Sequence, residues 1–252
     1  MPRVHPAAIV DPRAELASDV VVGPYAIVEA DAVLAAGCVL HPHAIVRSFA
    51  ALGSGTVVHP FAVIGGEAQA KGGVPGPSWV EVGEGNVFRE HVTVHGGTEG
   101  RATRIGAKNL FMVGAHVAHD VAIGSHCVLA NYVQLAGHVV VGDWVTFGGL
   151  SGVAQRVRIG EGAFVAAGSG CERDVPPFVV VQGDRARVRG VNVVGLKRRS
   201  VPQASIRSLK RAVHALWSSG SHYADALSAL ADVADPYVQR LATELRSRGA
   251  PP

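Results

Sequence analysis

Hydrophobic residues recur every sixth position along most of this chain. One run extends from Val4 to Ile64 and a second from Ile105 to Val165, with eleven anchor positions in each. The anchors are Val4, Val10, Leu16, Val22, Val28, Leu34, Leu40, Val46, Leu52, Val58 and Ile64, then Ile105, Phe111, Val117, Ile123, Leu129, Leu135, Val141, Phe147, Val153, Ile159 and Val165. Four positions after each anchor of the second run stands a small or β-branched residue, except for the larger Asn109. A period of six is neither helical nor simply alternating, and it predicts a solenoid.

Two inward positions in every six residues suit a short strand followed by a sharp turn. Three such strands close one triangular coil of about 18 residues. Coils of this kind stack at the strand spacing of a sheet, about 4.8 Å. Residues 18 apart are therefore predicted to lie directly above one another. A β-sandwich with regular turns is the alternative, and two unbroken runs of anchors argue against it.

Two interruptions of the period predict loops that extend from the coils. They are residues 65–78 and 95–104, and both are expected to border the functional cleft because loops on a rigid scaffold carry function. Glycine often follows an anchor, as at Gly106 and Gly124, which we interpret as easing the turn. The adjacent prolines at 176 and 177 are expected to end the coils.

The period changes to a helical one from about Val201. Ile206, Leu209, Val213, Leu216 and Trp217 share one face of a predicted helix that begins near Pro202 and stops at Gly220. Ser221 is expected to cap a second helix with Leu227 and Leu230, and Asp235–Pro236 to open a third with Val238, Leu241 and Leu245. We therefore predict a β-helix over residues 1–185, then a connecting segment and a small helical domain over 186–252.

Composition limits the classes of function. The 252 residues carry a net charge of +3, and the basic residues that cluster between Arg185 and Arg211 lack a nucleic-acid motif, so an anionic small molecule or an acidic protein is the expected partner. Cys38, Cys127 and Cys171 predict buried free thiols in a reducing compartment. With no leader and no apolar membrane span in the sequence, we expect a cytoplasmic protein that does not insert into a membrane.

The candidate chemistry lies in a histidine-rich segment of the second run. Counting by eighteen places His119, Gly137 and Gln155 in one column, and Asp120 beside His138 in the next. A histidine next to an aspartate, with a glycine N–H nearby, is a general base with an oxyanion donor. Spacing alone leaves functional and structural interpretations open for His116 and His138.

Several sequence strings resemble one family of acyltransferases. They are VHPAAIV, FREHVTVHGGT, GAHVAHD, LANYVQLAGHV, DVPPFVVVQGD and GVNVVGLKRR, in this order from Val4 to Arg199. The repeat resembles that of left-handed parallel β-helix proteins, and the strings resemble the acyl-carrier-protein–UDP-N-acetylglucosamine O-acyltransferases of lipid A synthesis. The resemblance implies a left-handed helix and a homotrimer with active sites between subunits. It also implies acyl carrier protein and a UDP-sugar as substrates, with no cofactor or metal.

The resemblance also implies individual roles. His119 matches the general base that accepts the proton of the sugar 3-hydroxyl, Asp120 matches the residue that orients it, and the N–H of Gly137 matches the oxyanion donor. The positions that match contacts to the nucleotide-sugar or the acyl chain are His116, His138, Gln155, Ala167, Asn192, Arg198 and Arg199. The basic stretch up to Arg211 would meet the acidic carrier protein.

Three positions depart from the family pattern. Ala154 stands where the family has histidine, Val194 where it has glutamate, and Ala167 where it has a small glycine that sets the depth of the acyl pocket. Ala167 therefore predicts a shorter acyl chain. In the divergent loop at 65–78, Lys71 is a weak candidate for substrate contact. The alternatives are a paralogous acyltransferase on another nucleotide-sugar, a zinc-dependent hydratase like the γ-class carbonic anhydrases with histidine ligands from stacked coils, and a non-catalytic scaffold that binds a carrier protein.

Overall fold

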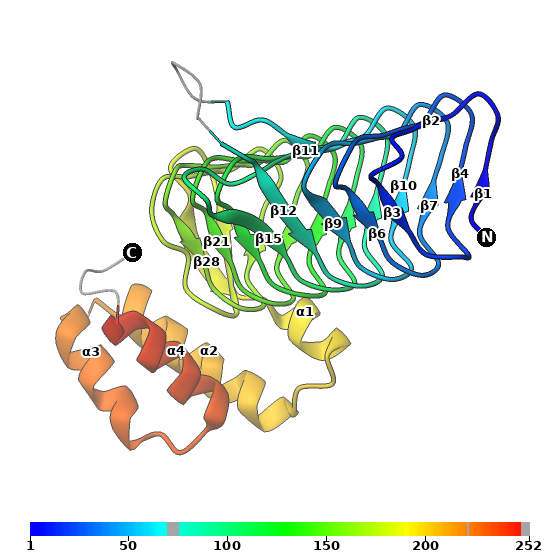
Figure 1. The fold of residues 1–252 in the computed structure, drawn as a ribbon. Helices are drawn as coiled ribbons and strands as arrows, with labels where there is room; N and C mark the ends of the chain where they lie inside the picture. The colour runs from blue at the N-terminus through cyan, green and yellow to red at the C-terminus, as the bar shows by residue number, and fades with distance from the viewer. Residues whose placement is uncertain (70–75, 221, 248–252) are drawn as a thin grey trace.

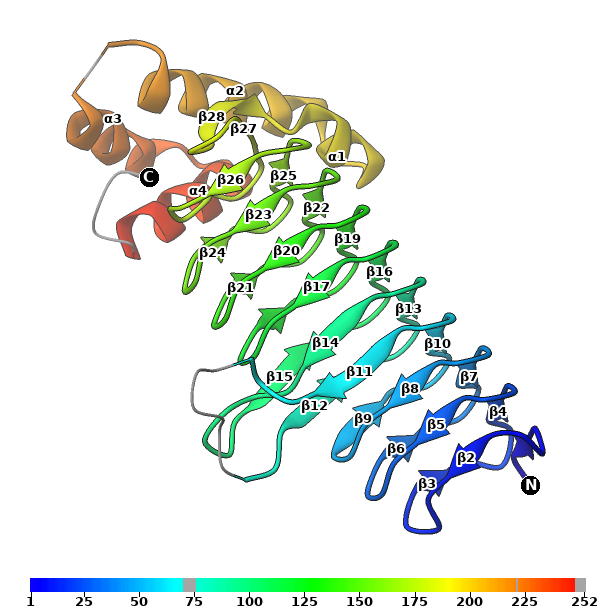
Figure 2. The same ribbon diagram turned by 90° about the horizontal axis from the view of Figure 1, so that it is seen from above.

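The chain forms a long parallel β-helix followed by four α-helices, in a computed structural model that describes residues 1–69, 76–220 and 222–247 (Figure 1). Lys71 therefore lies outside the described residues. Three sheets wrap around a single core, and within each sheet the strands of successive coils pair in parallel. The left-handed parallel β-helix implied by the resemblance is thus the observed fold, and Figure 2 shows its coils stacked from the N-terminus to the helices.

The strands are short, and from β1 to β26 each sheet contains every third strand of the chain. Sheet A contains β1 (Arg3–Val4), β4 (Val21–Val22), β7 (Val39–Leu40), β10 (Val57–Val58), β13 (Val87–Phe88), β16 (Leu110–Phe111), β19 (Val128–Leu129), β22 (Thr146–Phe147), β25 (Phe164–Val165), β27 (Val179–Gln182) and β28 (Arg187–Val191). Sheet B contains β2 (Ile9–Val10), β5 (Ile27–Val28), β8 (Ile45–Val46), β11 (Val63–Gly66), β14 (Thr93–His95), β17 (His116–Val117), β20 (Gln134–Leu135), β23 (Gly152–Val153) and β26 (Gly170–Cys171). Sheet C contains β3 (Glu15–Leu16), β6 (Val33–Leu34), β9 (Ala50–Leu52), β12 (Trp79–Val82), β15 (Ala102–Ile105), β18 (Ala122–Ile123), β21 (Val140–Val141) and β24 (Arg158–Ile159).

The strand register confirms the spacing of eighteen. His116 pairs with Gln134, and Gln134 pairs with Gly152 one coil further on. The anchors fill the core from Val22 onward, whereas Val4 in the first coil is 40% exposed, because no segment among the described residues covers that end of the solenoid. Cys38, Cys127 and Cys171 are buried free thiols, as predicted.

The glycines after the anchors serve close stacking, which corrects our interpretation of them as turn residues. A Cβ at Gly106 would lie 2.7 Å from the carbonyl carbon of Gly124, and one at Gly142 would lie 2.7 Å from the amide nitrogen of Glu161. The left-handed residue of each turn comes two positions later and is often not glycine. Asp120 (φ 60°), His138 (φ 61°) and Arg156 (φ 67°) all occupy this position.

Asn109 is the large residue among the small inward positions, and hydrogen bonds explain its presence. Its side chain accepts a hydrogen bond from the N–H of Cys127 at 2.7 Å and donates one to the carbonyl of Gly124 at 3.0 Å. The N–H of Asn109 in turn donates to the side-chain oxygen of Asn86. These buried amides therefore tie three successive coils together.

Replacing Asn109 with leucine is expected to lower the free energy of unfolding by about 2–4 kcal/mol. The change keeps the branched shape of the side chain but leaves the Cys127 N–H and the Gly124 carbonyl buried without partners, at about 1–3 kcal/mol each. Denaturant unfolding measures the loss. Thr103→Val is the matched control, because the Thr103 hydroxyl is buried without a hydrogen-bond partner among the described residues and its removal should cost almost nothing. Equal stability of the two variants would contradict this account.

The coils end one strand later than the prolines suggested. β27 still pairs in parallel with β25, and β28 then pairs with β27 in the antiparallel direction. Pro176 and Pro177 fall in the turn before β27, where no ladder N–H is needed. The predicted domain boundary at residue 185 falls between these two strands.

Four α-helices follow the last strand. They are α1 (Val193–Arg198), α2 (Gln203–Trp217), α3 (Tyr223–Ala229) and α4 (Pro236–Ser247), with the short 3₁₀ helix η1 (Leu230–Asp232) before α4. The predicted apolar face of α2 is buried apart from a partly exposed Trp217, and α2 packs against β28 at the C-terminal end of the solenoid (Figure 1). Ser221, the expected cap of α3, lies outside the described residues. Among the described residues, no helix is long and apolar enough to cross a membrane.

Candidate active site

The turns after β17 and β20 bring the predicted catalytic residues together. The N–H of His138 donates to the carbonyl of His119 at 3.0 Å, and the N–H of Arg156 donates to the carbonyl of Gly137 at 3.0 Å. His119, Gly137 and Gln155 therefore stack in successive coils, and Asp120 lies beside His138 in the neighbouring column. The arithmetic from the sequence is confirmed at this corner between sheets B and C.

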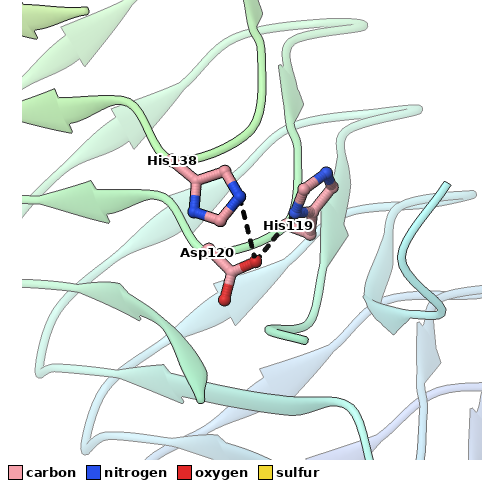
Figure 3. A group of neighbouring side chains, drawn as sticks. All are labelled: His119, Asp120 and His138. Carbon is pink, nitrogen blue, oxygen red and sulfur yellow. Dashed lines mark hydrogen bonds and ion pairs between the residues drawn. The ribbon is translucent and has the colours of Figure 1, made fainter. Parts of the chain in front are cut away.

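Asp120 is the centre of a hydrogen-bonded cluster (Figure 3). Its Oδ2 lies 2.8 Å from Nδ1 of His119 and 3.7 Å from Nε2 of His138. Only 4% of the Asp120 side chain is exposed, against 16% for His119. With the proton on Nδ1 donated to Asp120, the Nε2 atom of His119 is left as an acceptor, which is the form that a general base requires.

Thr98, which was not among the residues predicted from the sequence, also contacts Asp120. Its N–H donates to Oδ1 at 3.1 Å and its hydroxyl donates to Oδ2 at 2.7 Å. Burial alone would raise the pKa of the Asp120 carboxyl, but hydrogen bonds from His119 and Thr98 outweigh it and hold that pKa below its ordinary value. Asp120 is therefore a carboxylate at neutral pH and can stabilise a protonated His119.

Gly137 lies directly against the imidazole of His119. A Cβ on Gly137 would lie 2.6 Å from Cε1 and 2.7 Å from Nε2 of His119, so only glycine leaves room for the ring. No hydrogen-bond acceptor for the Gly137 N–H is found in the described part of the chain. This N–H is therefore available to donate a hydrogen bond to an oxyanion.

A cavity of about 670 Å³ opens along sheet B beside these residues. Many of its lining residues are small, and His116, His119 and Gln155 also line it; the small residues are Ala118, Ala136, Gly137, Gly152, Ala154 and Gly170. Gln69, from the predicted loop at 65–78, contributes to the wall as expected for a loop beside the cleft. Gln134 and Glu172 add polar groups, so the cavity combines a stretch of small residues with hydrogen-bonding side chains.

His116 lies at the edge of this cavity as a neutral side chain. Burial and the nearby His95 lower the pKa of His116 to about 4. Its Nδ1 lies 2.8 Å from the hydroxyl of Thr93. His116 therefore offers a hydrogen-bonding group to the cavity but no charge at neutral pH.

Comparison with known proteins identifies the family. A family model for the second domain of UDP-N-acetylglucosamine O-acyltransferases matches residues 174–250. The chain is 52% identical over 232 residues to the acyl-[acyl-carrier-protein]–UDP-N-acetylglucosamine O-acyltransferase of Alkalilimnicola ehrlichii, covering 91% of this chain and 90% of that protein. The corresponding enzyme of Stenotrophomonas maltophilia is 47% identical over 236 residues, covering 92% and 90%. The chain belongs to this acyltransferase family.

Solved structures of the family share the fold. The UDP-N-acetylglucosamine O-acyltransferase of Moraxella catarrhalis superimposes with a TM-score of 0.91 at 33% identity, covering 97% of this chain and 96% of that chain. The Bacteroides fragilis enzyme gives 0.93 at 28% identity, covering 96% of each. The left-handed β-helix with a helical C-terminal part is thus the fold of this acyltransferase family.

Four other residues expected at the acyltransferase site lie outside the cavity of a single chain. Ala167 is an exposed residue in the turn after β25, on a different corner of the helix. Asn192 caps α1, accepting from the N–H of Gly195 and donating to the carbonyl of Gly162, both at 3.0 Å. Arg198 is exposed near the end of α1, whereas Arg199 pairs with Glu161. The single chain therefore brings together six of the ten predicted residues.

His119, Asp120 and His138 are also the kinds of residue that bind metals in other enzymes, and their ligand atoms lie within 4.8 Å of one another. However, ligands at about 2.0–2.2 Å from a tetrahedral zinc lie more than 3 Å apart. Nδ1 of His119 and Oδ2 of Asp120 are 2.8 Å apart, a hydrogen-bond distance. The cluster therefore fits a base with its orienting carboxylate better than a zinc site.

Proposed function

We propose that this protein transfers a 3-hydroxyacyl chain from acyl carrier protein to the 3-hydroxyl of UDP-N-acetylglucosamine, the first step of lipid A biosynthesis. The observation that carries the proposal is the contact of His119 with both Asp120 and Gly137 at the edge of a trough of about 670 Å³ that small residues line in part. This arrangement supplies a base, its orienting carboxylate, an oxyanion donor and space for a chain. The two substrates, acyl carrier protein and UDP-N-acetylglucosamine, are proposed from membership of the family.

The geometry supports one sequence of proton transfers. Nε2 of His119 accepts the proton of the sugar hydroxyl as its oxygen bonds to the thioester carbonyl carbon. The N–H of Gly137 donates a hydrogen bond to the resulting oxyanion, and Asp120 stabilises the imidazolium. Collapse of the intermediate breaks the carbon–sulfur bond, and His119 returns its proton to the departing thiolate of the carrier. The ester and a free thiol are the products.

The proposal includes a homotrimer. In a single chain, Asn192 and Arg199 are the caps of α1 and Arg198 is its last residue, and none of the three lines the cavity beside His119. A neighbouring subunit can bring its α1 to the edge of the trough and complete the nucleotide-sugar site, with basic residues near Arg211 facing the carrier protein. No metal or cofactor takes part, because His119 supplies the base and the carrier supplies an activated thioester.

Thiol release tests this function. The purified protein is mixed with UDP-N-acetylglucosamine and 3-hydroxyacyl carrier proteins, and the free thiol is measured with and without a metal chelator. Turnover that resists the chelator supports the proposal. Activity only with another nucleotide-sugar would identify a paralogous enzyme, and stoichiometric bound zinc with hydration of carbon dioxide would identify the hydratase. Binding of acyl carrier protein without thiol release would identify the protein as a non-catalytic scaffold.

Replacing Ala167 with glycine is expected to shift the preference toward a longer acyl chain. In the family, a glycine at this position sets the depth of the acyl pocket, so removing one methyl group admits about one more methylene. Each methylene is worth about 10–200-fold in kcat/KM. The measurement is kcat/KM over a series of acyl carrier proteins that differ by single carbons. The same order of preference in both proteins would show that Ala167 does not limit chain length.

A further inference from the structure

The second interruption of the repeat, residues 95–104, carries Thr98 to the centre of the histidine cluster. The excursion leaves the solenoid after β14 and returns to it at β15. Thr98 lies between these strands, 9% exposed, with its N–H and hydroxyl both bonded to Asp120. The loop thus reaches the carboxylate that holds His119.

The position of Thr98 is fixed by contacts of the loop itself. The N–H of Gly97 donates to the carbonyl of Trp79 at 3.0 Å, and the N–H of Arg101 donates to the carbonyl of Thr98 at 2.9 Å. A Cβ on Gly97 would lie 2.3 Å from the carbonyl oxygen of Arg101. The tight packing of this loop leaves Thr98 little freedom to move away from Asp120.

Oδ2 of Asp120 has two imidazoles within reach. His119 is bonded to it, while Nε2 of His138 lies 3.7 Å away, a small rotation of the carboxylate from a hydrogen bond. The two donors of Thr98 hold both carboxylate oxygens and so fix this rotation. Asp120 can orient the base only while it stays turned toward His119.

We propose that Thr98 is a positioning residue that keeps the Asp120 carboxylate paired with His119 rather than His138. The inference rests on the proposed function for its consequence in catalysis, since His119 is the base of that reaction. The contacts themselves do not depend on the substrate. Removing the hydroxyl leaves the Thr98 N–H on Oδ1 and frees Oδ2 to divide its time between the two histidines.

The charges around His138 set the direction of the expected change. Burial lowers the pKa of His138, the Asp120 carboxylate raises it, and Arg156, His119 and Arg101 lower it further. If the Asp120 carboxylate turns toward His138, it raises the pKa of His138 further. The titration midpoint of His138 should therefore rise when the Thr98 hydroxyl is removed, while the fraction of His119 with its proton on Nδ1 should fall.

The test compares Thr98→Val, Thr98→Ser and Thr103→Val in the full-length protein. We expect Thr98→Val to lower kcat by about tenfold with KM nearly unchanged, as for the loss of one hydrogen bond to a charged group. Thr98→Ser restores the hydroxyl and should recover most of the rate. Thr103→Val removes a buried hydroxyl that has no partner in the described part of the chain, and it should behave as wild type.

Nitrogen NMR of the histidine rings gives the second measurement and needs no turnover. Thr98→Val should raise the His138 midpoint and change the His119 tautomer, and neither shift should occur in an Asp120→Asn background. Unchanged histidine signals in Thr98→Val, or an equal loss of rate when Asp120 is already asparagine, would overturn the proposal. A wild-type protein without transferase activity would sink the proposed function instead and leave the NMR outcome to decide the role of Thr98.

Discussion

Replacing His119 with glutamine is expected to slow acyl transfer by about 10²–10⁴-fold, the usual contribution of a general base. Glutamine fills a similar space and can still donate a hydrogen bond to Asp120, but it cannot accept a proton at neutral pH. The sugar hydroxyl would then attack without a base. Steady-state thiol release at saturating substrates measures the change in kcat.

His126→Gln is the matched control for this variant. His126 belongs to the same histidine-rich segment as His119, but it stacks on Trp144 and does not line the cavity. The His126→Gln variant should have the kcat and the melting temperature of the wild-type protein. If His119→Gln keeps the wild-type kcat, another group must accept the proton and the proposed role of His119 is wrong.

The β-helix could be predicted from the sequence because the repeat is strictly periodic. For the same reason, the stacking of His119 on Gly137 and of Asp120 on His138 could be predicted. Parallel strands stack in register when each coil has the same length, so a slip of one residue would expose every inward side chain. Counting by eighteen therefore placed His119 over Gly137 without any structural information. The same count brought Asp120 within reach of His138.

Thr98 could not be found in this way, because insertions break the count. It precedes Asp120 by 22 residues instead of 18, because it lies within the loop of residues 95–104, which lengthens its coil. The length of a loop does not determine where its tip lies. The sequence does show that Thr98 is a polar residue next to glycines, in a loop predicted to border the cleft. This signal does not reveal which side chain Thr98 contacts.

The sequence was also insufficient for contacts that depend on packing between distant parts of the chain. The glycines after the anchors were predicted to ease turns of the backbone. In the structure they are required because a Cβ would overlap the backbone of the next coil. Asn192 was assigned to substrate through the resemblance, and its side chain also holds α1 to Gly162, thirty residues earlier. Such contacts arise only when the solenoid and the helices are packed together.

Replacing Gly137 with alanine is expected to reduce kcat by about 10²-fold, the cost of displacing a reacting group by about 1 Å. The new methyl group would overlap the imidazole of His119, where Cε1 and Nε2 lie 2.6 and 2.7 Å from the Cβ position. The ring must rotate away, and its hydrogen bond to Asp120 would lengthen. The fold should survive because the nearest atoms belong to a side chain and not to the backbone.

Gly149→Ala provides the comparison, because Gly149 stands two residues after the anchor Phe147, as Gly137 stands after Leu135. Its added methyl group would meet no atom closer than 3.3 Å, so kcat should change by less than about twofold. The double variant His119→Gln with Gly137→Ala separates two causes. If the methyl group acts by displacing the imidazole, the double variant should be no slower than His119→Gln alone. A further loss would mean that the methyl group disturbs the N–H of Gly137. The lower kcat would then result from weaker stabilisation of the oxyanion by this N–H.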